Sequence, residues 1–449
     1  MSARGTRNRE LIALIPVALL LTAGFAAVFI QEGSNQLGNL SLVYGGYFLA
    51  ICLATHLYLR ARLPYADPYL FPLMALLAAF GLVILYRIND ELARDQASLF
   101  VLGLVLFVLT IEFLRDYEVL ERYRYLIATL GIALLLAPRL PGIGQQVNGA
   151  YLGVQIGPIS FQPAEFAKIC IVIFLASYLR EHREVLIVGA RRVAGVTLPP
   201  LKHFGPLLVI WGASMFMLVY IRDLGSSLMF YAAFLSLLYV ATGRFSFVVI
   251  GMALFLVGAW FFANAVPHVH DRVDVWLDPY QHPQQSGYQV LQSIFAQADG
   301  GLFGQGFGQS LLYIPGSHPP VALLPAAQTD TIYALIVDEV GLFGASAVCL
   351  IYLLIAARGF KTAIIASDGF SKLLATGLTA VFAIQAFVII GGVTRVIPLT
   401  GVTLPLISYG GSSIVANFVL LALLLLVSDR ARREAVEPAG RAVALGAAA

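Results

Sequence analysis

Few side chains in this sequence can do chemistry, and some of them fall inside apolar stretches. Of the 449 residues, 12% are charged and 59% are apolar. Glu165 and Lys168 open one such stretch in the motif QPAEFAK, at a spacing that places both on one face of a helix. A charge inside a bilayer costs about 3 kcal/mol or more, so these opposite charges predict a buried pair. The pair is either a structural link or a means by which Lys168 offers a cation to an anionic lipid headgroup.

Other acidic residues raise the same question of structural or functional use. Asp223 lies between two apolar stretches in RDLGSS, and Asp338 and Glu339 are adjacent within a third. Neighbouring residues point to different faces of a helix, so at least one of these two acids should face the interior or an interfacial partner. Glu112 lies near the end of its stretch, where its carboxylate can reach the interface.

A second set of ionisable side chains lies in one long segment between apolar stretches, residues 267–330. It includes a glycine-rich tract, GGLFGQGFGQ, and many aromatic residues, which argue against disorder. Long segments of this kind are usually functional, so we predict that it folds back onto the membrane surface. Its ionisable side chains include Asp271, Arg272, Asp274, Asp278, His282, Asp299 and Asp330.

Apolar stretches of membrane-spanning length must position these groups, and we find about twelve of them. The sequence therefore predicts an all-α fold, a polytopic bundle of transmembrane helices. The predicted spans lie near 11–30, 42–59, 69–86, 97–114, 124–138, 165–179, 203–221, 226–242, 246–266, 331–356, 373–393 and 413–428.

The basic residues predict the orientation of the spans. Most of the 28 Lys and Arg residues fall in alternate connecting segments that include both termini. Because positive charge is retained on the cytoplasmic side, both termini should be cytoplasmic. The net charge of +3 follows from this bias and gives no reason to expect nucleic acid. Three cysteines, Cys52, Cys170 and Cys349, are too scattered for a metal site.

Two shorter external segments, 139–164 and 394–412, share the glycine and proline content of the long one. Non-helical backbone at membrane depth persists only where protein covers it or where it lines a wet cavity. We therefore predict that all three segments converge on one external cleft.

Seven motifs in this order resemble those of the SEDS family (shape, elongation, division and sporulation), the FtsW/RodA/SpoVE group. The resemblance covers roughly 69–428 and implies a membrane glycosyltransferase with a ten-span core. Residues 1–68 would add a cytoplasmic segment and two spans, and 429–449 would form a disordered cytoplasmic tail. The motifs are NGA (148–150), QPAEFAK (162–168), RDLGSS (222–227), WLDPYQHPQQSGYQVLQS (276–293), GGLFGQGFGQ (300–309), QTD (328–330) with DEVGLFG (338–344), and GGVTRVIPLTGVTLPLISYGGSS (391–413).

The resemblance also implies residue roles. Family members polymerise lipid II, and the second acid of their D/N-P-x-x-D-P loop is the expected base. Here Asp278 matches the first acid and His282 takes the place of the second. A histidine can also accept a proton, and Asp278 could serve if the loop shifts. Lys168, Arg272 and Arg395 would contact the pyrophosphate.

The same motifs make Glu165, Asp330 and Ser408 substrate-binding candidates. A divalent cation, Mg²⁺ or Mn²⁺, on the pyrophosphate is an expectation from the family alone. The glycine tract could approach phosphates through its backbone N–H groups.

Three functions stay open at this point. The first is a lipid II polymerase at the external face of a bacterial cytoplasmic membrane, working with a class B penicillin-binding transpeptidase and other wall-synthesis membrane proteins. The second is a catalytically silent scaffold or regulator, which the histidine at position 282 favours. The third is a flippase for lipid-linked precursors. The motifs do not separate elongation from division or sporulation.

Overall fold

The computed structural model describes residues 3–31, 40–147, 150–157, 159–187, 191–193, 196–198, 212, 216, 220–221, 223–314 and 321–446. These residues are predominantly helical, as the apolar stretches predict. The chain divides into two compact units. Unit 1 comprises residues 1–117, 292–372 and 403–449, and unit 2 comprises 118–291 and 373–402.

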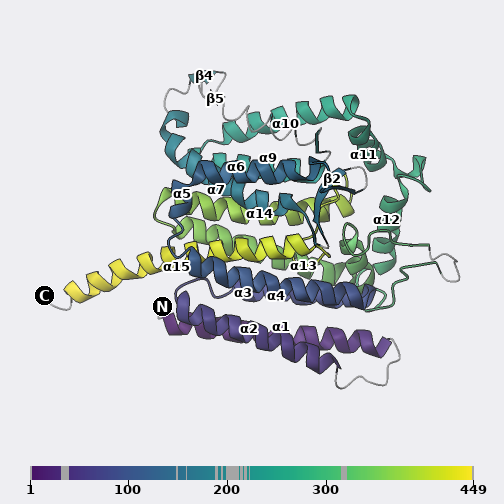
Figure 1. Cartoon of the computed structure of the whole chain (residues 1–449), viewed down its shortest axis with the longest axis horizontal. Coiled ribbons are helices and arrows are strands. Elements are labelled where there is room, and N and C mark those ends of the chain that lie inside the picture. Colours follow the sequence, from purple (N-terminus) through teal and green to yellow (C-terminus); the bar gives the residue numbers. More distant parts are fainter. Residues whose placement is uncertain are drawn as a thin grey trace. The chain divides into compact units, whose positions relative to one another are not determined.

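Unit 1 is a helical bundle. α1 packs on α2 and α3, α3 packs on α4 and α13, and α15 packs on α4 and α13 (Figure 1). Its long helices are α1 (Ala3–Gln31), α2 (Leu40–Arg62), α3 (Leu70–Ile88), α4 (Asp90–Phe113), α13 (Ile332–Ile365) and α15 (Gly411–Gly446).

The close approach of α4 and α15 follows from one small residue facing one large one. A Cβ atom on Gly103 would lie 2.9 Å from the ring of Phe418. That ring also meets Phe100 edge-on, at 5.3 Å between centroids, and both aromatic side chains are buried. Aromatic pairs of this geometry add to the stability gained from buried area.

Unit 2 is also helical, and it contains the strands of the described chain. α7 packs on α6 and α9, and α10 packs on α9 and α11. A Cβ on Gly377 of α14 would touch Val172 of α7 and Leu237 of α9, so α14 joins this core. The helices are α5 (Val119–Arg122), α6 (Arg124–Leu136), η1 (Ala137–Arg139), α7 (Pro163–Ile187), α9 (Leu224–Thr242), α10 (Phe245–Ala265), α11 (Pro267–Leu277), η4 (Pro279–Gln281) and α14 (Gly369–Val393).

Within the described ranges, eight helices are long and apolar enough to cross a membrane. They correspond to eight of the predicted spans, and α2, α6 and α7 coincide with three more. α6 has 13 residues, which is short for a full crossing. The predicted span at 203–221 lies almost wholly outside the described residues. The polytopic helical fold is thus confirmed.

α13 is interrupted at Gly341, whose φ of 70° and ψ of 179° are not helical. The glycine-rich tract fills the gap. Gln305 and Gly306 donate backbone N–H bonds to the carbonyls of Asp338 and Glu339, at 2.8 and 3.1 Å. In return, the N–H groups that follow Gly341 donate to carbonyls in the tract. Backbone that would be unsatisfied in lipid is therefore paired within the protein.

The glycines of the tract are required by this contact. A Cβ on Gly304 would lie 2.2 Å from the carbonyl oxygen of Glu339, and one on Gly300 would lie 2.1 Å from that of Val337. Gly304 also has a φ of 81°, which disfavours other residues. These contacts give the tract a structural use that the sequence did not predict.

Two regions differ from the sequence-based predictions. The segment 139–164 contains an antiparallel three-stranded sheet, β1 (Gly144–Val147), β2 (Ala150–Ile156) and β3 (Ile159–Phe161), because its alternating apolar residues suit strands. A short hairpin, β4 (Arg191–Val193) and β5 (Val196–Leu198), follows α7.

The predicted disordered tail from 429 is the second difference. α15 continues without a break to Gly446. Asp429 is buried and accepts the N–H groups of Tyr65 and Ala66 at 2.7 and 3.1 Å. The start of the tail is therefore packed, because its carboxylate caps the connection between α2 and α3.

Candidate functional site

The motif WLDPYQHP forms the end of α11 and the turn that follows it. α11 ends at Leu277, and the Asp278 N–H donates to the Asp274 carbonyl at 2.8 Å. Pro279 begins η4, and the side chain of Asp278 accepts the Tyr280 N–H at 3.1 Å. Asp278 and His282 are both exposed. Both candidate catalytic side chains therefore lie on the surface of one short turn.

A glycine closes this turn. The carbonyl of His282 accepts the N–H groups of Gln285 and Gly287 at 3.2 and 3.1 Å. A Cβ on Gly287 would lie 2.2 Å from the Pro279 carbonyl oxygen, so no larger residue fits without movement. The backbone on both sides of His282 is thus held by local hydrogen bonds.

Two predicted substrate-binding arginines fasten α11 to the segment 394–402. Arg395 donates to the carbonyls of Trp276 and Leu277, at 2.8 and 3.0 Å from Nη2. Arg272 donates to the Leu399 carbonyl at 2.9 Å. A cation at the last carbonyls of a helix satisfies them and interacts favourably with the helix dipole. Arg395 thereby holds the two residues that precede Asp278.

Glu165 and Lys168 lie side by side in the interior of unit 2, which confirms the predicted pair. Lys168 Nζ lies 2.6 Å from Glu165 Oε2, and the two side chains are 0% and 3% exposed. Gln385 of α14 completes the group: its Oε1 accepts from Lys168 at 2.7 Å and its Nε2 donates to Glu165 at 3.2 Å. A buried pair with its remaining hydrogen bonds satisfied is stable in a low dielectric.

Asp223 caps the N-terminus of α9. Its carboxylate accepts the Ser226 N–H at 2.9 Å and the Ser226 hydroxyl at 2.5 Å. Burial raises the pKa of Asp223, while the bonds from Ser226 and the charge of Arg272 act in the opposite direction. Asp223 therefore serves as the N-cap of α9, and its burial disfavours the ionised form of its carboxyl group.

The remaining two predicted residues belong to unit 1. The Ser408 hydroxyl donates to the Thr329 carbonyl at 2.8 Å and accepts the Leu404 N–H at 2.9 Å. Ser408 is buried, and Asp330 is half-buried beside Thr329. Ser408 therefore links the end of segment 267–330 to segment 394–412.

Arg87 pairs with the interrupted helix, a contact that the sequence analysis missed. Its Nε lies 2.9 Å from Glu339 Oε1, and its Nη2 donates to the carbonyls of Gly308 and Ser310. Glu339 is 1% exposed. Glu339 lies inside one predicted span and Arg87 at the end of another, and each is a charge that needs a partner there. The sequence does not show that the two residues are partners of each other.

The predicted convergence of loops is seen in part. Segment 394–412 contacts segment 267–330 in each unit, through Arg272 and Leu399 in unit 2 and through Ser408 and Thr329 in unit 1. Asn148 and Gly149 of the NGA motif lie outside the described residues. A shared cleft that includes segment 139–164 stays a prediction.

The described side chains do not favour a metal site. Among them, no group of three or more His, Cys, Asp or Glu side chains lies close enough to hold a metal ion. We therefore derive no step through a divalent cation.

Comparison with known proteins identifies what this arrangement is similar to. A family model described as a cell cycle protein, covering FtsW, RodA and SpoVE, matches residues 68–433. The peptidoglycan glycosyltransferase RodA of Mycobacterium tuberculosis is 40% identical over 441 residues, which cover 95% of this chain and 91% of that protein. The stage V sporulation protein E of Bacillus subtilis is 30% identical, covering 82% of this chain and 98% of that protein.

Solved structures agree with the fold. A chain from a peptidoglycan synthase complex that coordinates polymerization and crosslinking superposes with a TM-score of 0.63 at 27% identity, covering 82% of this chain and 98% of that one. The rod shape determining protein RodA of Thermus thermophilus superposes with a TM-score of 0.56 at 24% identity, covering 81% and 96%. At this lower identity, the similarity to the Thermus thermophilus structure supports the fold alone.

Proposed function

The chain belongs to the FtsW, RodA and SpoVE family, and from that membership we infer that it is a peptidoglycan glycosyltransferase of the membrane. It polymerises peptidoglycan in elongation, division or sporulation. We propose that its substrate is lipid II and that the reaction takes place at the external face of the cytoplasmic membrane. The observation that carries the site assignment is the exposed turn at Asp278 and His282, held to segment 394–402 by Arg395.

The proposed reaction needs one base and a site for the leaving group. The 4-hydroxyl of one lipid-linked sugar attacks the anomeric carbon of another, forming the new glycosidic bond. The hydroxyl proton passes to the base, and undecaprenyl pyrophosphate leaves with the bonding electrons. We propose Asp278 or His282 as the base, because each is exposed and each can accept a proton.

Arg272 and Arg395 are the proposed contacts to the pyrophosphate. Each is half-buried and donates to backbone carbonyls, and a guanidinium group has five N–H donors with which to reach an anion as well. Asp330, half-buried at the end of the long segment, remains a proposed sugar contact. The burial of Glu165, Lys168 and Ser408 favours an indirect role, in which they hold the helices that carry the site.

The proposed partner is a class B penicillin-binding transpeptidase. A structural relative at 27% identity is part of a peptidoglycan synthase complex, which supports a similar assembly here. The bias of basic residues supports a cytoplasmic location for both termini.

A second function has one observation in its favour. A catalytically silent scaffold would explain why position 282 carries a histidine in place of the family's acid. Such a protein would keep its transpeptidase contact and lose polymerisation.

Purified full-length chain, incubated with lipid II alone and with its cognate transpeptidase, tests both functions. We expect glycan chains from the wild type and a large loss in Asp278→Asn or His282→Ala. Asp271→Asn is the matched control, because Asp271 is also exposed on α11. No glycan from the wild type with its transpeptidase, together with a gain of synthesis in His282→Asp, would establish the scaffold instead.

A further inference from the structure

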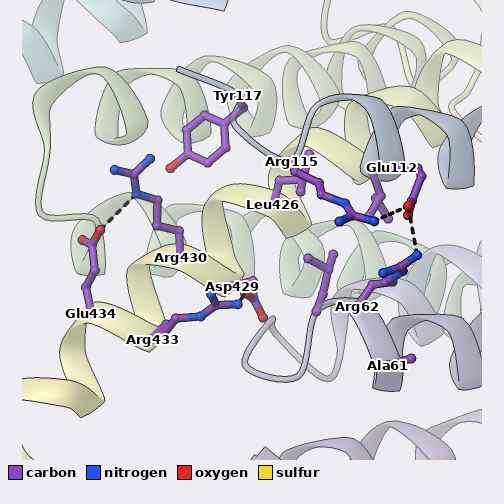
Figure 2. Close-up of a pocket in the computed structure, with 12 residues that line it drawn as sticks. Ala61, Arg62, Glu112, Arg115, Tyr117, Leu426, Asp429, Arg430, Arg433 and Glu434 are labelled. Carbon is purple, nitrogen blue, oxygen red and sulfur yellow. Dashed lines mark hydrogen bonds and ion pairs between the residues drawn. The ribbon is translucent and has the colours of Figure 1, made fainter. Parts of the chain in front are cut away.

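A cavity of about 530 Å³ lies in unit 1, between the C-terminal ends of α2 and α4 and the middle of α15. Figure 2 shows the residues that line it. Ligand pockets usually have volumes of roughly 300–1,000 Å³. None of its lining residues belongs to the proposed polymerase site, so it is a separate feature of the protein.

The polar lining carries more positive than negative charge. Four arginines and three carboxylates surround the opening, and all four arginines lie in segments that we predict to be cytoplasmic. The arginines are Arg62, Arg115, Arg430 and Arg433, and the acids are Glu112, Asp429 and Glu434.

Two of the arginines converge on a single carboxylate. Glu112 accepts from Arg62 at 2.9 Å and also pairs with Arg115, and both bonds are drawn in Figure 2. Arg62 is 46% exposed and Arg115 is 59% exposed. Each guanidinium group has five N–H donors, so one shared carboxylate leaves most of them directed to solvent.

The other acids are already engaged. Asp429 accepts two backbone N–H groups and pairs with Arg433 at 2.6 Å. Glu434 pairs with Arg430 at 3.0 Å and accepts a hydroxyl from Ser367. Both carboxylates are thus engaged by other groups of the protein, and the four arginines of the lining outnumber its three acids.

The wall of the cavity also contains apolar side chains. Leu63, Ile111 and Leu426 line it as buried residues, together with Tyr117, whose ring lies 5.7 Å from the guanidinium carbon of Arg430. The Tyr117 hydroxyl bonds Ser371 at 2.6 Å, so it is already paired. The cavity therefore combines cationic donors with apolar side chains in one wall.

We propose that this cavity binds the phosphodiester headgroup of an anionic phospholipid, such as phosphatidylglycerol, from the adjacent leaflet. The ends of membrane-spanning helices lie at the depth of lipid headgroups. Guanidinium groups bind phosphate oxygens in bidentate fashion, which Arg62 and Arg115 can do around the opening.

The test uses the full chain in a neutral detergent. Short-chain phosphatidylglycerol, phosphatidylcholine with the same chains, and glycerol 3-phosphate are titrated separately, and bound lipid is measured by native mass spectrometry. We expect phosphatidylglycerol to bind at least about tenfold more tightly than the other two, and to weaken as salt is added. Equal binding of phosphatidylglycerol and phosphatidylcholine would overturn the proposal, and equal binding of glycerol 3-phosphate would show a site for free anions instead.

The variant is the double substitution Arg62→Gln and Arg115→Gln, and the control is Arg94→Gln. Arg94 lies at the other end of α4, is 68% exposed and pairs with Asp90. We expect the double variant to lose phosphatidylglycerol binding and the control to keep it. Thermal unfolding without lipid verifies that both variants fold, and Arg62→Lys with Arg115→Lys provides a milder pair. Wild-type binding in the double glutamine variant would rule out the site.

Discussion

Trp276 and Arg395 bond each other in both directions. The indole Nε1 donates to the Arg395 carbonyl at 3.0 Å, and the Arg395 guanidinium donates to the Trp276 carbonyl at 2.8 Å. Arg395 adopts a φ of 59°, which is uncommon for a residue other than glycine. Such a conformation persists only where surrounding contacts hold it. The reciprocal bonds hold α11 and the start of the turn that carries Asp278 against segment 394–402.

Arg395→Gln should therefore lower the rate of polymerisation. We expect kcat to fall on the order of tenfold, because the turn that carries Asp278 loses its charged anchor and small displacements of reacting groups are costly. Steady-state measurement with lipid II separates kcat from KM. Trp276→Phe removes only the indole donor and should have a smaller effect. A rise in KM with an unchanged kcat would show that Arg395 acts only through its proposed pyrophosphate contact and does not position the turn.

Removing Lys168 alone should destabilise the protein more than removing both members of the pair. Lys168→Met leaves the carboxylate of Glu165 buried without its cation, at a cost of about 3–5 kcal/mol. The double variant with Glu165→Gln retains an uncharged interior and should recover much of that loss. Thermal unfolding in detergent compares the two variants with the wild type. Equal stability of the single and double variants would contradict a coupled pair.

Gly304→Ala should destabilise unit 1. The added Cβ would meet the Glu339 carbonyl oxygen at 2.2 Å, at a φ that disfavours alanine, and the contact between the glycine tract and the interrupted α13 must shift. We expect a loss of about 2 kcal/mol or more. Gly46→Ala is the control, because a Cβ there meets nothing within 4 Å. Thermal unfolding measures both, and a silent Gly304→Ala would refute the packing role of the tract.

The pH dependence of polymerisation distinguishes the two candidate bases. If His282 accepts the proton, activity should fall on acidification, because a protonated imidazole cannot accept. A carboxylate base at Asp278 would sustain activity to lower pH. His282→Asp should preserve or raise activity and extend it to lower pH. An unchanged profile in His282→Asp would exclude His282 as the base.

Asp223 should make stability depend on pH. Burial raises its pKa above the ordinary value near 4, so the ionised form is disfavoured in the folded protein at neutral pH. That cost disappears as the pH falls through the raised pKa, so this residue stabilises the fold on acidification from pH 7 towards the ordinary value near 4. Asp223→Asn should remove this gain, and Asp299→Asn, at an exposed acid, should retain it. Thermal unfolding at both pH values provides the comparison.

The sequence predicted the helical elements because their signal is local. Apolar runs of spanning length mark the helices, and the 163–187 helix places Glu165 and Lys168 within reach of each other by spacing alone. Alternation of apolar residues in 144–161 was also a local signal for strands, but it was read there as irregular backbone. The helical extent of α15 beyond 429 was missed because composition does not reveal the buried cap made by Asp429.

Contacts between residues far apart in the chain could not be predicted from local sequence patterns. Gln385 joins the Glu165–Lys168 pair from 217 residues away in the chain from Lys168, and Arg87 reaches Glu339 across 252 residues. Neither Gln385 nor Arg87 lies in a local pattern that points to its partner. Only the packing of the helices brings each side chain into contact with that partner. The sequence suggested that the glycine tract could approach phosphates, because its glycines permit close approach, whatever group approaches them.

What the sequence by itself determined is the class of protein: a polytopic membrane bundle with family motifs in order, a loop motif that contains Asp278 and His282, and a charge bias for orientation. Periodicity, length and residue type carry these properties, and none depends on which helices are neighbours. The tertiary structure decided which charges are paired and that the glycine tract satisfies the backbone at the interruption of α13 at Gly341. It also decided that arginines from α2, from α15 and from the segment after α4 line one cavity. Those properties arise from distances between residues far apart in the chain, and such distances are set only when the helices pack.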